Sequence, residues 1–162
     1  MKIKSFMAMM VAAVTIVLGM SSCSSDDEPE VAVATQVAGS YTGNEIVMVM
    51  GEESSNDTKT YSFTKVSDTT IDMSIPEMGM GGMMTIPSLT VKNIPLTKSG
   101  DAIMGKLDSF AGTVLNASGS ERAFTISNIT VALNGNTVVV TFSLKFGSMP
   151  MSMETTFTGT KK

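Results

Sequence analysis

The chain has 162 residues, of which 43 % are hydrophobic, and it carries 11 Lys and Arg, 15 Asp and Glu and no His. This acidic balance, without any basic run, argues against nucleic-acid binding through phosphate contacts. The lack of His and the presence of a single Cys exclude Ser–His and Cys–His nucleophile systems and the usual zinc ligand sets. We therefore expect a protein without catalytic residues or a cofactor.

The N-terminus has the pattern of a secretory signal peptide. Lys2 and Lys4 form a positive start, Phe6–Leu18 is an uncharged apolar run of 13 residues, and mostly small residues follow up to Ser22. A membrane-spanning helix needs about 20 apolar residues, so this run is too short for a typical span. The pattern predicts a signal peptide over residues 1–22, with an uncleaved N-terminal anchor as the alternative.

Cys23 follows this segment in the sequence Met20-Ser21-Ser22-Cys23. This arrangement resembles a bacterial lipoprotein signal, in which the cysteine becomes the acylated first residue of the mature protein. The resemblance implies lipidation of Cys23 and attachment to a membrane, which two or three acyl chains make stable. The acidic run Ser25–Glu28 resembles the tag that directs Bacteroidetes lipoproteins to the outer face of the outer membrane, so we expect a surface-exposed, lipid-anchored protein there.

Residues 23–35 are first polar and acidic and then small and apolar, with Pro29 inside. This composition predicts an acidic tether without a fold of its own. Residues 36–162 are strand-like throughout and large enough for one domain with a real core. Because Cys23 is the only cysteine, that domain has no disulfide, and its stability must come from packing and backbone pairing.

Four strands are predicted in the first half of the domain, at residues 38–50, 58–66, 69–75 and within 88–97. Glu52–Asp57 reads as a polar loop, and Pro76 ends the third strand because proline cannot donate to a ladder. The parity of the first strand places Glu45 inward, and we expect this carboxylate at the barrel mouth in contact with water.

Four more strands are predicted at residues 102–110, 122–133, 136–146 and about 151–158, with a Gly- and Ser-rich stretch at 111–120. Asn134-Gly135 predicts a type I′ hairpin because both residues accept positive φ. In the last two strands, one parity is apolar and the other is polar, and Met151 and Met153 fall on the apolar parity.

One apolar and one polar face per strand is typical of a sheet with a single buried side. Eight such strands with short hairpins predict an all-β fold, an antiparallel up-and-down eight-stranded barrel, which leaves no open edge. A two-sheet sandwich is the alternative. A membrane-spanning barrel would be apolar outside and polar inside, which is the reverse of this pattern.

Several short motifs occur in a characteristic order: Gly39-Ser40-Tyr41-Thr42-Gly43, Gly82-Met83, Ile94-Pro95-Leu96-Thr97, Met149-Pro150-Met151 and Thr156-Phe157-Thr158-Gly159-Thr160-Lys161. With the signal that precedes them, they resemble the calycin-like (lipocalin-like) β-barrel domain of Bacteroidetes lipoproteins, over about residues 36–162. The resemblance implies a closed antiparallel barrel. It supplies no defined ligand and no catalytic residue.

Methionine is unusually frequent, most of all in the segment 78–84 between Pro76 and Pro87, which we expect to be a loop. Flexible Met side chains are common on surfaces that bind varied apolar partners. The leading hypothesis is therefore a barrel that binds a small apolar ligand without catalysis. Its candidate ligand-binding residues are Met73, Met80, Met83, Met84, Phe142 and Phe146.

Two other functions agree with the sequence. The barrel could be a structural or interaction scaffold of a surface complex, for which Val47–Met50, apolar on both faces, is the candidate contact surface. Alternatively, the thioethers of Met78, Met80 and Met83 could capture Cu(I), since soft sulfur ligands select this ion. No His or Cys in the domain supports a metal site of another kind.

Overall fold

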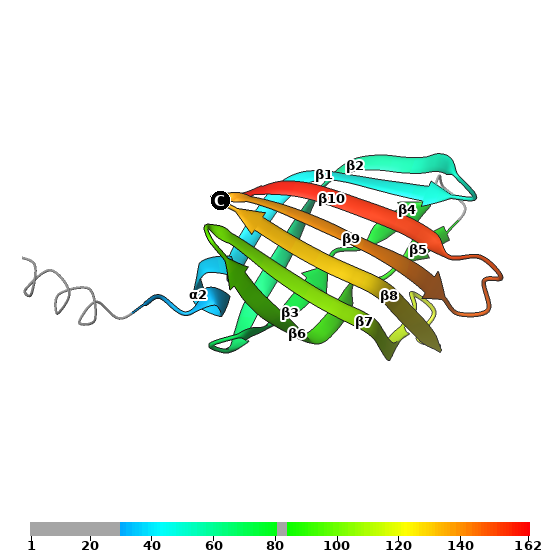
Figure 1. The fold of residues 1–162 in the computed structure, drawn as a ribbon. Helices are drawn as coiled ribbons and strands as arrows, with labels where there is room; N and C mark the ends of the chain where they lie inside the picture. The colour runs from blue at the N-terminus through cyan, green and yellow to red at the C-terminus, as the bar shows by residue number, and fades with distance from the viewer. Residues whose placement is uncertain (1–29, 81–83) are drawn as a thin grey trace, which may run out of the picture. The chain divides into compact units, whose positions relative to one another are not determined.

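Eight antiparallel strands close into one barrel in the computed structural model, which describes residues 30–80 and 84–162 (Figure 1). The order around the barrel is β1-β10-β9-β8-β7-β6-β3-β2, so neighbours in the sequence are neighbours in the sheet and the last strand pairs with the first. The predicted up-and-down barrel is thereby confirmed, and the sandwich is excluded. The strands are β1 (Gly39–Val49), β2 (Glu52–Ser67), β3 (Thr70–Ile75), β6 (Leu89–Ser99), β7 (Ala102–Leu115), β8 (Glu121–Asn134), β9 (Thr137–Phe146) and β10 (Met153–Lys161).

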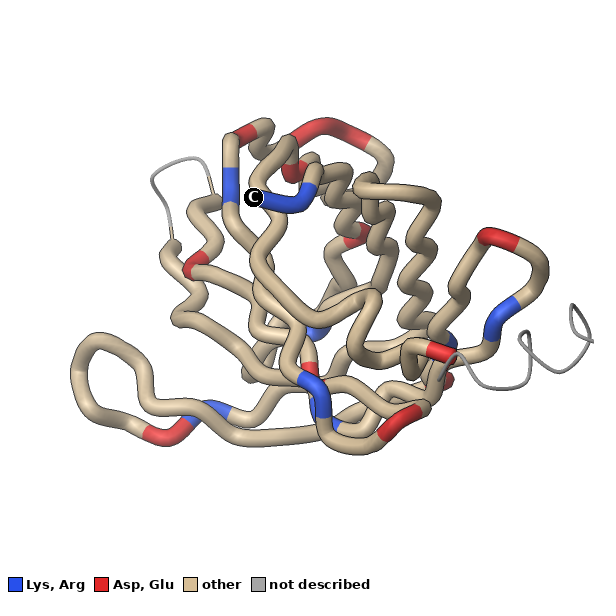
Figure 2. Tube along the Cα trace, turned by 90° about the vertical axis from the view of Figure 1, so that its left-hand side faces the viewer, with Lys and Arg blue, Asp and Glu red and all other residues tan. Residues whose placement is uncertain are grey.

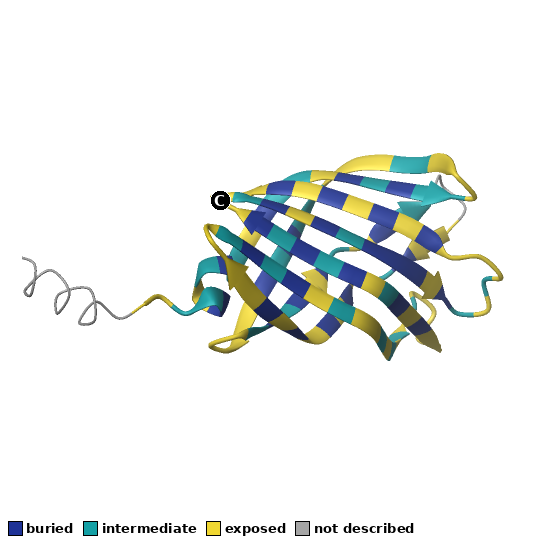
Figure 3. Cartoon of the chain, viewed as in Figure 1, coloured by how far each residue is buried: buried dark blue, intermediate teal, exposed yellow. Residues whose placement is uncertain are grey.

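The alternation of apolar and polar residues sets which side chains enter the barrel. Along β9 and β10 the predicted inward parity is buried, while most residues of the other parity are more exposed (Figure 3). A shift of one residue would turn every apolar side chain outward, so burial of one face holds the register. The β9–β10 register pairs Phe142 with Thr155 and Val140 with Phe157.

A short helix, α2 (Val33–Val37), covers the end of the barrel where β1 begins. Ala34 and Val37 lie on one face of this helix and are fully buried. The hydroxyl of Tyr41 donates to the carbonyl of Val37 at 2.9 Å, and the ammonium of Lys161 donates to the carbonyl of Gln36 at 3.0 Å. Both bonds satisfy carbonyls at the C-terminal end of the helix, which lack partners within it.

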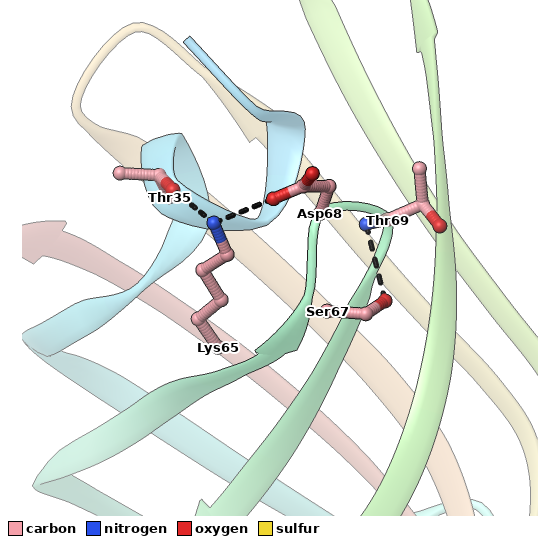
Figure 4. Close-up of polar contacts among 5 residues, drawn as sticks. All are labelled: Thr35, Lys65, Ser67, Asp68 and Thr69. Atoms are coloured by element: carbon pink, nitrogen blue, oxygen red, sulfur yellow. Dashed lines mark hydrogen bonds and ion pairs between the residues drawn. The ribbon is translucent and has the colours of Figure 1, made fainter.

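The β2–β3 turn holds the same helix from the other side (Figure 4). Lys65 donates to the hydroxyl of Thr35 at 3.1 Å and forms an ion pair with Asp68 at 2.7 Å. The backbone N–H of Ala34 donates to the carbonyl of Asp68 at 3.1 Å. The tether was expected to extend to Thr35, but a helix begins at Val33. Ala34 and Thr35 find these hydrogen-bond partners only in the folded barrel, so the sequence of this segment alone does not indicate the helix.

The Met-rich segment at the opposite end contains two short strands, β4 (Met78–Met80) and β5 (Met84–Ile86), where a loop was expected. They pair with each other and not with the barrel. Met78 and Ile86 are opposite each other, and both are buried in the core cluster. The hairpin therefore packs apolar side chains onto the core at this end.

Other differences from the sequence prediction concern strand ends and one turn. β2 begins at Glu52, so the predicted loop 52–57 is strand, and β7 continues to Leu115 into the Gly- and Ser-rich stretch. The addition to β2 is largely solvated on both faces, which removes the alternation that identifies a half-buried strand. The addition to β7 alternates exposed and half-buried residues, but small and polar residues predominate in it. The β8–β9 turn is formed by Gly135 and Asn136, with positive φ (+59°) at Gly135 alone, one residue later than the type I′ prediction.

The outer surface of the barrel is polar and of mixed charge. Figure 2 shows Lys and Arg positions scattered over several parts of the chain rather than gathered in one patch. Within the described residues, no helix is long and apolar enough to cross a membrane.

The seam between β1 and β10 depends on two facing glycines, Gly43 and Gly159. A Cβ atom at Gly43 would lie 1.9 Å from the carbonyl oxygen of Thr158, which is backbone and cannot rotate away. We expect Gly43→Ala to lower the free energy of unfolding by about 1–3 kcal/mol or more, as overpacking does. Urea denaturation followed by circular dichroism measures this change.

Gly79→Ala is the matched control, because a Cβ atom there meets no atom within 4 Å. Its free energy of unfolding should change by no more than about 0.5 kcal/mol. Equal stability of the Gly43→Ala and Gly79→Ala variants would show that the seam does not need a glycine.

Candidate functional site

The barrel interior is filled by side chains. A void able to hold a water molecule leaves exposed surface on the side chains around it, yet Tyr41, Tyr61, Met73 and Phe157 have none. Phe142 is also buried, with 2 % of its surface exposed. Met73 and Phe142, both predicted to bind ligand, therefore lie in the packed core, which agrees with the size of an eight-stranded barrel.

One acidic side chain is enclosed in this core. Glu45 faces inward as predicted, but only 1 % of it is exposed, so the expected contact with water is wrong. The hydroxyl of Tyr61 donates to Glu45 Oε2 at 2.5 Å, and the ring of Tyr61 stacks on Phe157 with the ring centres 4.1 Å apart. A hydrogen bond offsets part of the cost of burying a carboxylate.

Burial controls the titration of this pair. It raises the pKa of Glu45, which the hydrogen bond from Tyr61 and the charge of Lys59 partly oppose. Burial, with the neighbouring charge of Glu45, raises the pKa of Tyr61 well above its usual value. Because the pair lies in a filled interior, its position points to a structural role.

Four of the seven large apolar side chains that are exposed in the described residues lie at the end of the barrel opposite α2. Met50 is 80 % exposed at the β1–β2 turn, Leu115 is 64 % exposed at the end of β7, and Met151 is 39 % exposed between β9 and β10. Met84, on β5, is 38 % exposed. In an up-and-down barrel these four connections share one end, and we call these four side chains the apolar rim (Figure 1). The predicted inward position of Met151 is wrong, because β10 begins only at Met153.

A pocket of about 380 Å³ opens beside this rim. Phe146 and the partly buried Met149 give it an apolar wall, and Arg122 brings a guanidinium group. No carboxylate within the described residues forms an ion pair with Arg122. The pocket is lined by Met84, Thr85, Asn116, Arg122, Phe146, Gly147, Ser148 and Met149.

The structure brings together only part of the predicted site. Met84 and Phe146 meet in the pocket, whereas Met80 lies opposite Met84 in the β4–β5 hairpin and is partly buried. Of the thioethers considered for Cu(I), Met78 is buried in the core and Met80 is partly buried. Met83 and Cys23 lie outside the described residues. In residues 30–80 and 84–162, no three acidic side chains converge as a metal site.

Sequence reasoning missed Arg122, Asn116 and Met149. Asn116 shapes the β7–β8 turn, since its Oδ1 accepts from the backbone N–H of Ser118 and Ser120 at 3.1 and 2.8 Å. This turn brings the start of β8, and with it Arg122, beside the β9–β10 connection that carries Met149. The available signal was that Arg122 is the single Arg of the chain.

The closed, filled, eight-stranded barrel defines the class of small antiparallel β-barrel proteins. Residues 37–160 match the calycin-like beta-barrel domain family, and the chain belongs to that family. No curated protein matches the chain.

A crystal structure of a "putative outer membrane protein" from Bacteroides fragilis has the same fold, with a TM-score of 0.63 and 18 % sequence identity. The alignment covers 81 % of this chain and 53 % of that one, so this chain spans about half the length of its structural neighbour. At this identity, the similarity concerns the fold alone.

The raised pKa of Glu45 makes stability depend on pH. The folded protein holds this proton more tightly than the unfolded chain, so the stabilisation is complete below the ordinary carboxyl pKa of about 4.3 and is lost as pH rises through the folded-state pKa. Glu45→Gln cannot titrate and keeps an acceptor for Tyr61. We expect this variant to lose less stability than the wild type between pH 4 and pH 7 in urea denaturation.

Glu121→Gln removes an exposed carboxylate of β8 and is the control for the loss of one acidic group. A Glu45→Gln profile parallel to the wild type would contradict the assignment of this pH dependence to Glu45.

Proposed function

We propose that this protein is a lipid-anchored barrel of the outer membrane that binds a small apolar ligand, without catalysis, in the pocket beside the apolar rim. The pocket of about 380 Å³ is the observation that carries the proposal. Its volume is within the usual range of ligand pockets, about 300–1,000 Å³. The filled interior moves the expected binding site from the centre of the barrel to its end.

The chemistry of the pocket favours an apolar ligand that carries an anionic group. Met84, Phe146 and Met149 offer thioether and aromatic surfaces that adapt to varied apolar shapes. Arg122 offers a guanidinium group without a carboxylate partner in the described chain, and its planar fork matches a carboxylate. A fatty acid has both features and is a suitable probe.

The scaffold alternative has its own support. The filled interior leaves no central ligand chamber around the buried aromatic residues, and Met50 offers apolar surface that a protein partner could cover. The other residues of the predicted contact surface, Val47–Val49, are buried or half-buried. The two functions differ in whether the pocket binds a small molecule when the protein is alone.

A fluorescent fatty acid tests the pocket. Met84→Glu places a negative charge in its apolar wall, which repels the carboxylate of the probe, so we expect the dissociation constant of the probe to rise about tenfold, a loss of about 1.4 kcal/mol. Val139→Glu is the matched control, because Val139 on the barrel wall is 37 % exposed and Met84 is 38 % exposed.

Arg122→Gln distinguishes the contribution of the anionic group of the ligand from that of its apolar chain. It should weaken binding of the fatty acid and leave binding of the corresponding fatty alcohol unchanged. If neither probe binds, or if Met84→Glu and Val139→Glu behave alike, the ligand proposal is wrong and the scaffold function is favoured.

The lipid anchor is tested separately in cells. We expect Cys23→Ala to abolish incorporation of labelled palmitate and to move the protein from the membrane fraction to the soluble fraction, because a single cysteine carries the acyl chains. Ser24→Ala is the neighbouring control. Unchanged labelling of Cys23→Ala would contradict the anchor, and protease treatment of intact cells reports surface exposure.

A further inference from the structure

The barrel wall is incompletely paired between β6 and β7. The ladder between these strands joins Leu96–Ser99 to Ala102–Gly105, next to the β6–β7 turn. Within residues 84–162, all of which the structure describes, the ladder has no further pair. Leu89–Pro95 of β6 and residues 106–115 of β7 therefore have strand conformation and pair on their other sides with β3 and β8, but not with each other.

Backbone kinks accompany the opening. Asn93 in β6 has a φ of +59° and Asn128 in β8 has a φ of +52°, which are left-handed values that Asn tolerates better than most residues. The backbone N–H of Asn93 donates to Asp72 Oδ1 at 2.9 Å, which holds this kink against β3. Asn128 lies where the β8–β9 register shifts, between Ser127 and Thr130. The two kinks therefore lie in β6 and β8, the strands on either side of β7.

A hollow of about 340 Å³ lies between the two unpaired edges. Leu89 on β6, Phe110 and Val114 on β7 and Phe124 on β8 give it apolar walls, while Gly112 adds no side chain. A Cβ atom at Gly112 would lie 2.8 Å from the ring of Phe124, so a glycine keeps this part of the wall open without moving that ring.

We propose that this opening, which we call the β6–β7 gap, is a docking site for an extended peptide strand of another protein. In a strand, alternate residues direct their N–H and C=O groups to the same side, so the unpaired edge of β7 offers a row of donors and acceptors. The edge of β6 offers such groups over Leu89–Lys92, because the N–H of Asn93 is bonded to Asp72 and Pro95 has no N–H. An extended peptide satisfies such a row by strand addition, and its alternate side chains enter the pockets between strands. A lipid tail would leave the same backbone groups without hydrogen-bond partners, and each such group would raise the free energy of the complex.

The surroundings of the gap define the preferred peptide. The hollow is apolar, so the inward side chains of the peptide should be apolar. Lys92, exposed on the outer face of β6, is the charged side chain among the residues that line the hollow. An acidic residue on the outward face of the peptide would therefore lie near a cation, which favours specificity and the rate of association.

The probe is a fluorescent peptide of roughly seven residues, a usual strand length, that alternates Thr and Val and carries a central Glu in place of one Thr. We expect saturable binding with a dissociation constant below about 1 mM. Hydrogen exchange with the peptide present should slow at amides within 89–95 or 106–115, while the already paired residues 102–105 stay unchanged. A peptide with N-methyl groups on alternate residues should bind about tenfold more weakly, because it lacks one row of donors.

A charge exchange tests the role of Lys92. Lys92→Glu should weaken binding of the Glu peptide about tenfold. The same substitution should strengthen binding of a peptide that carries Lys in place of Glu. Lys145 is an exposed residue of β9, and Lys145→Glu is the matched control. It should leave the affinity for both peptides unchanged. Melting curves of both variants confirm that each is folded.

Three outcomes would overturn the proposal: no binding at about 1 mM peptide, equal binding of the N-methylated peptide, or exchange protection outside the two edges. Dimerisation of the protein alone with protection of the same edges would instead assign the gap to a second copy of the chain, which also overturns it. Fatty-acid binding at the apolar rim is independent of each result, because none of the residues that line the gap lines the rim pocket.

Discussion

Closure of eight strands around a packed interior is the constraint on which the rest of the structure depends. Gly43 and Gly159 let β1 and β10 approach closely at the final seam, and large side chains such as Tyr61 and Phe157 then fill the space inside. A barrel of this strand number is just wide enough for such filling. Because the centre is closed around these side chains, the pockets described above lie at the barrel end and at the incomplete seam.

The sequence predicts the elements whose burial is one-sided. β9 alternates Val140 and Phe142 with more exposed residues, so its period of two follows from the pleat and from the single core face. The first part of β2 is mostly exposed on both faces, the last part of β7 is half-buried on one face only, and the composition of both resembles a loop. The helix α2 could not be predicted from local propensity, because Lys65, Asp68 and Lys161 hold it from distant parts of the chain.

The candidate site was less predictable than the fold for a related reason. Hollow and filled barrels have the same inward apolar parity, and the difference depends on how side chains from different strands meet. Met73 and Phe142 carry the correct parity and lie in the core, while Phe146, at the end of its strand, reaches the pocket. Arg122 and Met149 line the same pocket as Phe146 because the β7–β8 turn and the β9–β10 connection are neighbours at one end of the barrel. The periodicity of the sequence does not indicate which turns are neighbours.

The β6–β7 gap presents a problem that a closed barrel otherwise avoids, because an open strand edge invites pairing between copies of the chain. Its edges carry features that discourage such pairing: Lys92 and Lys106 are exposed charges, Pro95 lacks a backbone donor, and Asn93 bends the strand. Each of these features disfavours pairing with a long, flat strand more than pairing with a short one. A gap protected in this way can stay open on a monomer and still accept one short extended segment whose side chains and charge match its walls.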